Sequence, residues 1–240
     1  MRSTSEAKVV AEVFGTPIVV KGRTWFPYIE LGVWLGMAWV AGKGRPDRSM
    51  GERLGVGALT AATLLGSEWG HNLAHAAAAA WVGKPMDALK VTWGMPLVIY
   101  HNINDQTVTP RQHITRALGG PLFNAAILPF ALILHRFSRP GSTTRDVATA
   151  AVGMNLLLST ASLLPIPGID GGPILKWSLV EKGCTVAEAD ETIKKVDRVV
   201  GAGLGVAAGA AIKSRRKFLG AILALFSILA LAVGFGLVKE

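Results

Sequence analysis

Cysteine is almost absent from this 240-residue chain, in which Cys184 stands alone. A single thiol cannot form an internal disulfide, and it excludes a metal cluster held by several cysteines. Acidic residues are also few, since 16 Asp and Glu stand against 25 Lys and Arg, for a formal net charge of +9. No zinc knuckle, RNP-like aromatic motif or basic helix accompanies this positive charge, so we expect no nucleic-acid partner.

Apolar residues, in contrast, make up 50% of the chain, and the mean hydropathy is +0.40. This is more apolar than a typical soluble domain of this length. Lys and Arg gather in short segments between apolar runs, as charges that flank membrane helices do. We therefore expect an integral, multi-pass membrane protein that contacts membrane lipid. Positive charge occurs on nearly every connection, so the positive-inside rule does not give the orientation.

The expected fold class is mainly α, with about six membrane helices. The apolar runs that predict them are 26–41, 54–82, 117–135, 147–164, 199–212 and 218–238, of which 199–212 is the weakest. Two β segments are also expected. A strand pair lies within 9–21, broken at Gly15 to Pro17, and a strand or hairpin at the membrane edge lies within 83–116.

These patterns predict four parts of the chain. The N-terminal strand pair occupies 1–25, and a membrane core with the candidate metal site occupies 26–175. Segment 176–198 is charged and amphipathic, and it predicts a soluble helix capped at Thr185. The C-terminal membrane helices occupy 199–240.

The apolar run 54–82 carries two histidines, His71 and His75, four residues apart. On a helix of about 3.6 residues per turn they share a face and can bind one cation together, as in helical zinc sites. At about 100° per residue, Glu68 lies about 60° from His71, and Asn72 lies about 100° from it. Ionisable groups inside a membrane helix are costly and usually functional. Two histidines packed and hydrogen-bonded in a bundle are the alternative interpretation.

Three segments, one of which contains both histidines, carry in this order a resemblance to a known family. They are GHNLAHA (70–76), GGPLFN (119–124) and LLPIPGIDGG (163–172). These segments resemble the signature motifs of the site-2 protease family of intramembrane zinc metallopeptidases, which read H-E-x-x-H-A, G-P-x-x-N and L-L-P-x-P-x-L-D-G-G. The opening FGTPIVV, followed by a tryptophan and an apolar helix, is similar to prokaryotic members, so the resemblance spans about residues 13 to 175. It implies a polytopic protein in the cytoplasmic membrane of a prokaryote.

The resemblance also implies the ligands of a zinc ion. It assigns His71 and His75 as two ligands and Asp170 as the third protein ligand. Two imidazoles and one carboxylate leave a fourth position for water, as catalytic zinc sites do. Without the resemblance, Asp170 is an N-cap in a turn rich in Pro and Gly. Asn124, in the middle motif, is expected to donate a hydrogen bond toward the site, and an ordinary interhelical hydrogen bond is the alternative.

Asn72 departs from the family pattern, because it stands at the position of the catalytic glutamate. Its amide cannot accept a proton from water on zinc. Loss of a general base typically costs roughly 10²- to 10⁴-fold in rate. Glu68 is the nearby candidate for a substitute base, a further metal ligand, or an acceptor that fixes a histidine tautomer. A di-iron carboxylate site would need a second Glu-x-x-His, which the chain lacks.

Two functions therefore compete. The first is a zinc metallopeptidase that hydrolyses a transmembrane or juxtamembrane peptide substrate. The second is a catalytically inactive relative that still binds metal and binds membrane helices as clients. A small transporter is favoured by buried polar residues but not by the order of the motifs.

The remaining polar candidates are weaker. His101 and His113 are expected in the polar edge segment, as solvated or structural residues. His135 is expected at a helix end, where a cation suits the helix C-terminus. Glu30 is interpreted as an interfacial residue or as part of a cavity.

Overall fold

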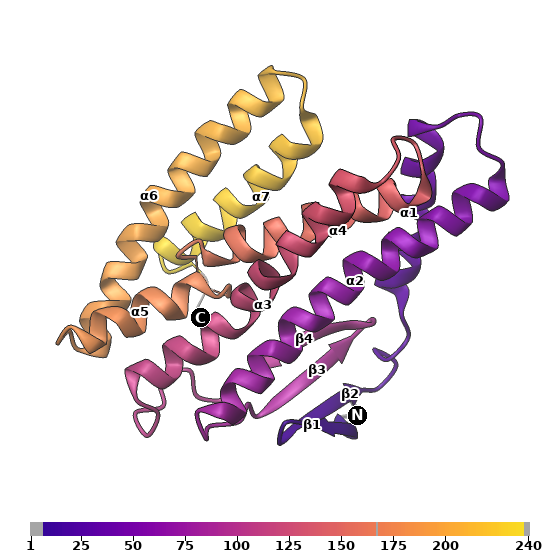
Figure 1. Cartoon of the computed structure of the whole chain (residues 1–240). Helices are drawn as coiled ribbons and strands as arrows, with labels where there is room; N and C mark the ends of the chain where they lie inside the picture. Colours follow the sequence, from indigo (N-terminus) through magenta and orange to yellow (C-terminus); the bar gives the residue numbers. More distant parts are fainter. Residues whose placement is uncertain (1–6, 167, 238–240) are drawn as a thin grey trace, which may run out of the picture. The chain divides into compact units, whose positions relative to one another are not determined.

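The computed structural model describes residues 7–166 and 168–237 (Figure 1). The first six residues of the predicted strand-pair segment lie outside the described residues, as do Pro167 of the third motif and residues 238–240. The described residues are mainly α-helical with one small sheet, which confirms the predicted fold class.

The chain divides into two compact units. The first comprises Met1–Asp105 and Leu118–Ala161, and the second comprises Gln106–Ala117 and Ser162–Glu240. Helix α3 (Pro110–Phe137) belongs to both, since it gives its first turns to the second unit and the rest to the first.

The sheet lies in the first unit, with its strands in the order β1-β2-β3-β4. They are β1 (Ala7–Val13), β2 (Thr16–Lys21), β3 (Ala88–Thr92) and β4 (Met95–Ile99). β1 and β2 form one antiparallel hairpin, β3 and β4 form another, and β2 runs parallel to β3. Each hairpin turns through two residues of positive φ, the second of which is Gly15 or Gly94, and glycine adopts this conformation without strain. Both predicted β segments are confirmed.

Helix α2 (Met50–Trp81) carries both histidines and runs alongside strands β3 and β4 of the sheet (Figure 1). It begins at a capping box in which Ser49 and Glu52 exchange side-chain and backbone hydrogen bonds. Helices α1 (Tyr28–Gly44) and α4 (Thr143–Thr160) pack against it. The core between α2 and the sheet is a cluster of buried apolar side chains: Ala76, Ala79, Met86 and Leu89. This packing fixes the rotation of α2 and therefore the direction of its histidine face.

Helix α3 begins at Pro110, earlier than the run 117–135 suggested. The expectation that 83–116 is polar and β-like is therefore wrong at its end. Thr109 and Gln112 form reciprocal hydrogen bonds at the helix start, and Pro110 occupies the first helical position, where its missing N–H costs nothing. The sequence Thr-Pro-Arg-Gln carries this signal, so the start was predictable. His113 consequently lies on α3 and is buried.

The second unit contains α5 (Gly171–Glu181), α6 (Val186–Lys213) and α7 (Lys217–Gly234), and α6 and α7 pack as a helical hairpin (Figure 1). The predicted cap at Thr185 is confirmed by a capping box with Glu188. The backbone N–H of Thr185 donates to the Glu188 carboxylate and, with the Thr185 hydroxyl, lowers the pKa of Glu188. Helix α6 runs unbroken across residues 198 and 199, so the amphipathic segment and the apolar run form one helix.

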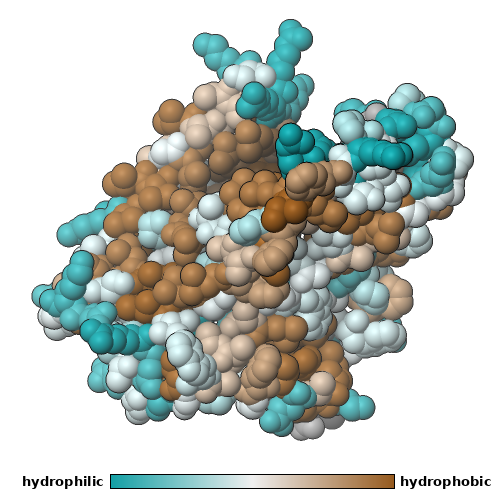
Figure 2. Space-filling model, in the orientation of Figure 1, coloured by the Kyte–Doolittle hydropathy of each residue, from teal (hydrophilic) through white to brown (hydrophobic). Residues whose placement is uncertain are grey.

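Three helices among the described residues are long and apolar enough to cross a membrane, fewer than the expected number of about six. They are α3, the segment Thr143–Leu163 that includes α4, and α7. Helix α1 has 17 residues, short for the roughly 20 that a span requires. Helices α2 and α6 carry charged residues within their length. Figure 2 shows a hydrophobic surface over α6 and α7 between hydrophilic ends, as expected of a membrane protein.

Candidate metal centre

Helix α2 brings the two predicted zinc histidines together. The side chains of His71 and His75 are buried, and their rings meet edge to face with centroids 4.7 Å apart. Their Nε2 atoms lie 3.1 Å apart. Two nitrogens that bind one tetrahedral zinc at about 2.0–2.1 Å lie about 3.3 Å from each other, so the pair has the spacing of two zinc ligands. The spacing also suits an N–H···N hydrogen bond, which is the alternative interpretation from the sequence.

Gly120 of α3 closes over both imidazoles. A methyl group on Gly120 would lie 2.6 Å from Cε1 of His71 and closer still to the Nε2 atoms of both histidines. Real Cβ atoms do not approach other atoms this closely, so the rings fit only because residue 120 has no side chain. The chemistry of the donors and this close-fitting space are suited to a small divalent ion such as zinc.

Asn124 binds the other side of the His71 ring. Its Oδ1 lies 2.6 Å from Nδ1 of His71, and Asn124 is fully buried. A carbonyl oxygen only accepts, so Nδ1–H of His71 donates and Nε2 keeps its lone pair. Toward the histidine Asn124 is therefore an acceptor, whereas the sequence interpretation expected a donor toward the site. Such outer partners orient metal-binding histidines in many proteins.

Two residues that the sequence analysis did not select complete this network. Asn155 of α4 accepts from Asn124 Nδ2 at 2.8 Å and donates from its own Nδ2 to Ser67 Oγ at 3.0 Å. Asn155 is also almost fully buried. A lone asparagine within the apolar run 147–164 was the available signal, because a polar side chain in a membrane helix usually has a specific partner.

Asn72 and Glu68 form a pair within α2. The Asn72 amide donates to the Glu68 carbonyl oxygen at 3.0 Å and to its carboxylate Oε1 at 3.2 Å. Asn72 is buried. The carboxylate of Glu68 is therefore held by the side chain at the position where the family has its glutamate.

Asp170 precedes α5 in the second unit. Its side chain makes no capping hydrogen bond to that helix, which weakens the alternative interpretation of an N-cap. The following Gly171 is buried against the carbonyls of Leu163 and Leu164, where a Cβ would overlap both oxygens. Glycine therefore permits the tight backbone after Asp170.

The three remaining histidines and Glu30, the weaker candidates from the sequence, have environments of their own. The ring of His113 stacks on that of Trp177 with centroids 3.8 Å apart. His101 lies exposed on a connection, and His135 lies in the last turn of α3. The carboxylate of Glu30 packs on Gly94, and its Oε2 is buried without a hydrogen-bond partner among the described residues.

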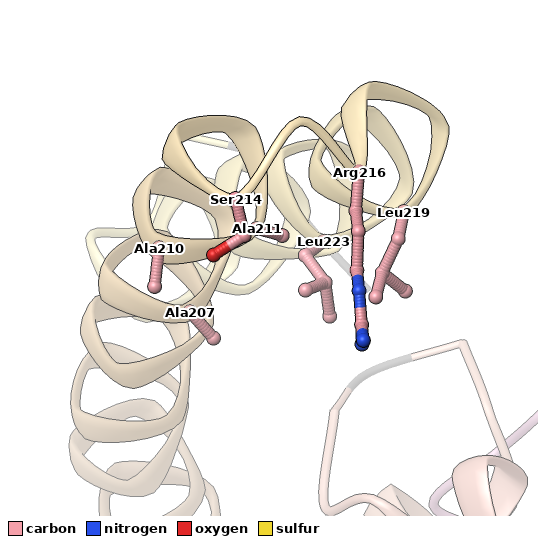
Figure 3. Close-up of a pocket in the computed structure, with 7 residues that line it drawn as sticks. All are labelled: Ala207, Ala210, Ala211, Ser214, Arg216, Leu219 and Leu223. Carbon is pink, nitrogen blue, oxygen red and sulfur yellow. The ribbon is translucent and has the colours of Figure 1, made fainter.

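A hollow of about 460 Å³ opens between α6 and α7 (Figure 3). Its lining is Ala207, Ala210, Ala211, Ser214, Arg216, Leu219 and Leu223. This lining contains one charged side chain and none of the predicted metal ligands, so the hollow is not the candidate metal centre.

Two known proteins are similar to this chain, one in a segment of its sequence and one in its fold. No family model matches the chain. A protein of Methanocaldococcus jannaschii named "Putative zinc metalloprotease" is 37% identical over 71 residues, which are 30% of this chain and 37% of that protein. The match thus covers little more than a third of the relative's length. The solved structure named "Site-2 Protease from Methanocaldococcus jannaschii" aligns with a TM-score of 0.55 and 16% identity, covering 98% of this chain and 97% of that one.

Proposed function

Because the shared fold and the matched segment support assignment of the chain to the site-2 protease family, we propose that it binds zinc through His71, His75 and Asp170. The observation that carries the proposal is the buried pair of Nε2 atoms 3.1 Å apart, with the Nδ1–H of His71 bound by Asn124. Bound zinc would supply Lewis-acid chemistry for the hydrolysis of a peptide bond. The chain is then a multi-pass protein of a prokaryotic cytoplasmic membrane.

We propose transmembrane or juxtamembrane peptides as its substrates, with weak or absent hydrolysis in the natural chain. His71 and Asn124 supply a preorganised ligand, but a proton acceptor is missing at position 72. Asn72 cannot act as general base. Glu68 sits about 4.5 Å along the helix axis from His71, on the side away from His75, at 1.5 Å per residue.

A catalytically inactive, metal-binding relative that binds membrane helices is the second candidate. The pairing of Asn72 with Glu68 favours it, because the nearest carboxylate on α2 is already hydrogen-bonded. Cleavage of a transmembrane peptide by the natural chain and by Glu68→Gln distinguishes the two candidates. If Glu68 is a substitute base, Glu68→Gln abolishes all cleavage of a transmembrane peptide and leaves zinc bound.

The zinc site itself has a direct test. Purified protein is expected to hold about one zinc per chain, and His71→Ala, His75→Ala and Asp170→Ala are each expected to lose it, because two remaining ligands bind a divalent ion poorly. Elemental analysis after dialysis measures the content. His101→Ala is the matched control, since that exposed histidine lies outside the site. Full zinc occupancy in His75→Ala would contradict the assignment.

A further inference from the structure

We infer that Asn155 and Ser67 are positioning residues that fix the tautomer of His71 by holding the Asn124 amide in one orientation. The inference rests on the proposed role of His71 as a zinc ligand. It concerns a relay of three polar side chains on three helices: Ser67 on α2, Asn124 on α3 and Asn155 on α4.

The relay has a fixed direction because backbone carbonyls anchor it. Asn155 Nδ2 donates to the carbonyl oxygen of Ala151 at 2.8 Å as well as to Ser67 Oγ. The Ser67 hydroxyl donates in turn to the carbonyl of Thr63, so its oxygen is left to accept. A carbonyl cannot donate, so the NH₂ group of Asn155 must face Ala151 and Ser67. Its Oδ1 is thereby turned toward Asn124.

The orientation of Asn155 decides that of Asn124. The Asn124 amide donates from Nδ2 to Asn155 Oδ1 at 2.8 Å and lies 3.4 Å from the Ser67 carbonyl oxygen, which also only accepts. Inverting this amide would place its oxygen against the oxygen of Asn155. It would also turn that oxygen toward the Ser67 carbonyl oxygen, and burial leaves no room for water to compensate for these facing acceptors.

The orientation of Asn124 determines which ring nitrogen of His71 carries the proton. With Asn124 Oδ1 facing Nδ1 of His71, the proton is on Nδ1 and the lone pair is on Nε2. An inverted Asn124 would donate to Nδ1 and move the proton to Nε2, which then cannot bind a metal. The relay therefore keeps His71 in the ligand tautomer, and Ser67 and Asn155 act through Asn124 without touching the ion.

Asn155→Leu tests the inference, because it replaces the amide that accepts from Asn124 with an apolar side chain of similar size. The zinc affinity of purified protein is expected to fall about 10- to 100-fold, the range typical of outer partners of metal-binding histidines. Asn155→Asp retains an acceptor toward Asn124 but loses the donor to Ala151 and Ser67, so its zinc affinity is expected to fall less than that of Asn155→Leu. Ser159→Ala is the control, since Ser159 is a buried polar residue of α4 that bonds within its own helix.

A second readout separates tautomer control from simple packing. Nitrogen NMR of ¹⁵N-histidine protein, prepared without metal, distinguishes the two tautomers. His71 is expected to carry its proton on Nδ1 in the natural chain and in Asn155→Asp, and to shift toward the Nε2–H form in Asn155→Leu. Ser67→Ala, which removes one acceptor of Asn155, gives a milder shift and serves if Asn155→Leu does not fold.

The outcomes also separate this inference from the proposed function. Unchanged zinc affinity and an unchanged Nδ1–H signal in Asn155→Leu would overturn the relay, while loss of zinc in His75→Ala would still uphold the metal site. Absence of zinc from the natural chain would overturn the proposed function, and the NMR signal would still decide whether the relay sets the tautomer.

Discussion

Exchanging the side chains at positions 68 and 72 is expected to produce the largest gain in activity. The double variant Glu68→Gln, Asn72→Glu should hydrolyse a transmembrane peptide roughly 10²- to 10⁴-fold faster than the natural chain, the usual contribution of a general base. The carboxylate then follows His71 directly and lies between the two histidines. Cleavage of the peptide in detergent or liposomes measures the gain.

The structure explains why the double variant should be faster than Asn72→Glu alone. Asn72 Nδ2 lies 3.2 Å from Glu68 Oε1, so Asn72→Glu alone would bring two carboxylates together. Their repulsion disfavours the ionised base. With Glu68→Gln present, the new amide supplies the donor that Asn72 supplied before. The expected order of rates is therefore double variant, Asn72→Glu alone, and natural chain.

Two controls accompany the exchange. Adding His75→Ala to the double variant should remove its activity, because the gain depends on zinc. Zinc content should be equal in the natural chain and in the double variant, because neither substitution alters a proposed ligand. Robust hydrolysis by the natural chain, unchanged in Glu68→Gln, would show that the base lies elsewhere and that the inactive-relative hypothesis is wrong.

Gly120→Ala is expected to cause the largest loss of zinc without removing a ligand. The added methyl group would overlap the Nε2 atoms of His71 and His75, so the rings must move apart or rotate. Zinc ligands hold their distances within about 0.2 Å of ideal values, so this displacement should lower zinc content to that of His75→Ala. Zinc titration and elemental analysis give the readout.

The loss can be separated from a general effect on folding. Alanine is preferred to glycine inside a helix by about 0.8–1.0 kcal/mol, so Gly120→Ala carries no intrinsic helix penalty. Gly153→Ala on α4 is the matched control, because a Cβ there meets no atom within 4 Å. It should keep full zinc and equal or greater thermal stability. Full zinc in Gly120→Ala would show that the ion is not bound between these two nitrogens.

Local features of this protein were predictable from the sequence. The four-residue spacing of His71 and His75 placed both on one face of a helix, because the helical period is local. The cap at Thr185 followed from a capping box within four residues. The same kind of signal, Thr-Pro-Arg-Gln, marked the start of α3 at Pro110. Even the hydrogen bond between Glu68 and Asn72 joins residues one turn apart, and such pairs are expected on a helix.

The number of apolar helices and the continuity of α6 were harder to predict from the sequence. Residue composition changes near position 198, and this change suggested a boundary between a soluble segment and a membrane run. A helix needs no uniform composition, only unbroken backbone hydrogen bonds, so α6 continues through both.

What the sequence determined by itself was the set of possible ligands: two imidazoles on one helix face, an aspartate in a glycine-rich turn, and an amide where a general base was expected. What only the tertiary structure decided was the direction of the hydrogen bonds around these ligands. Asn124 can donate or accept, and nothing within α3 selects one orientation. The choice is made by Asn155, 31 residues away on another helix, whose own amide is anchored by the carbonyl of Ala151. A side-chain amide has no preferred direction until fixed backbone groups surround it.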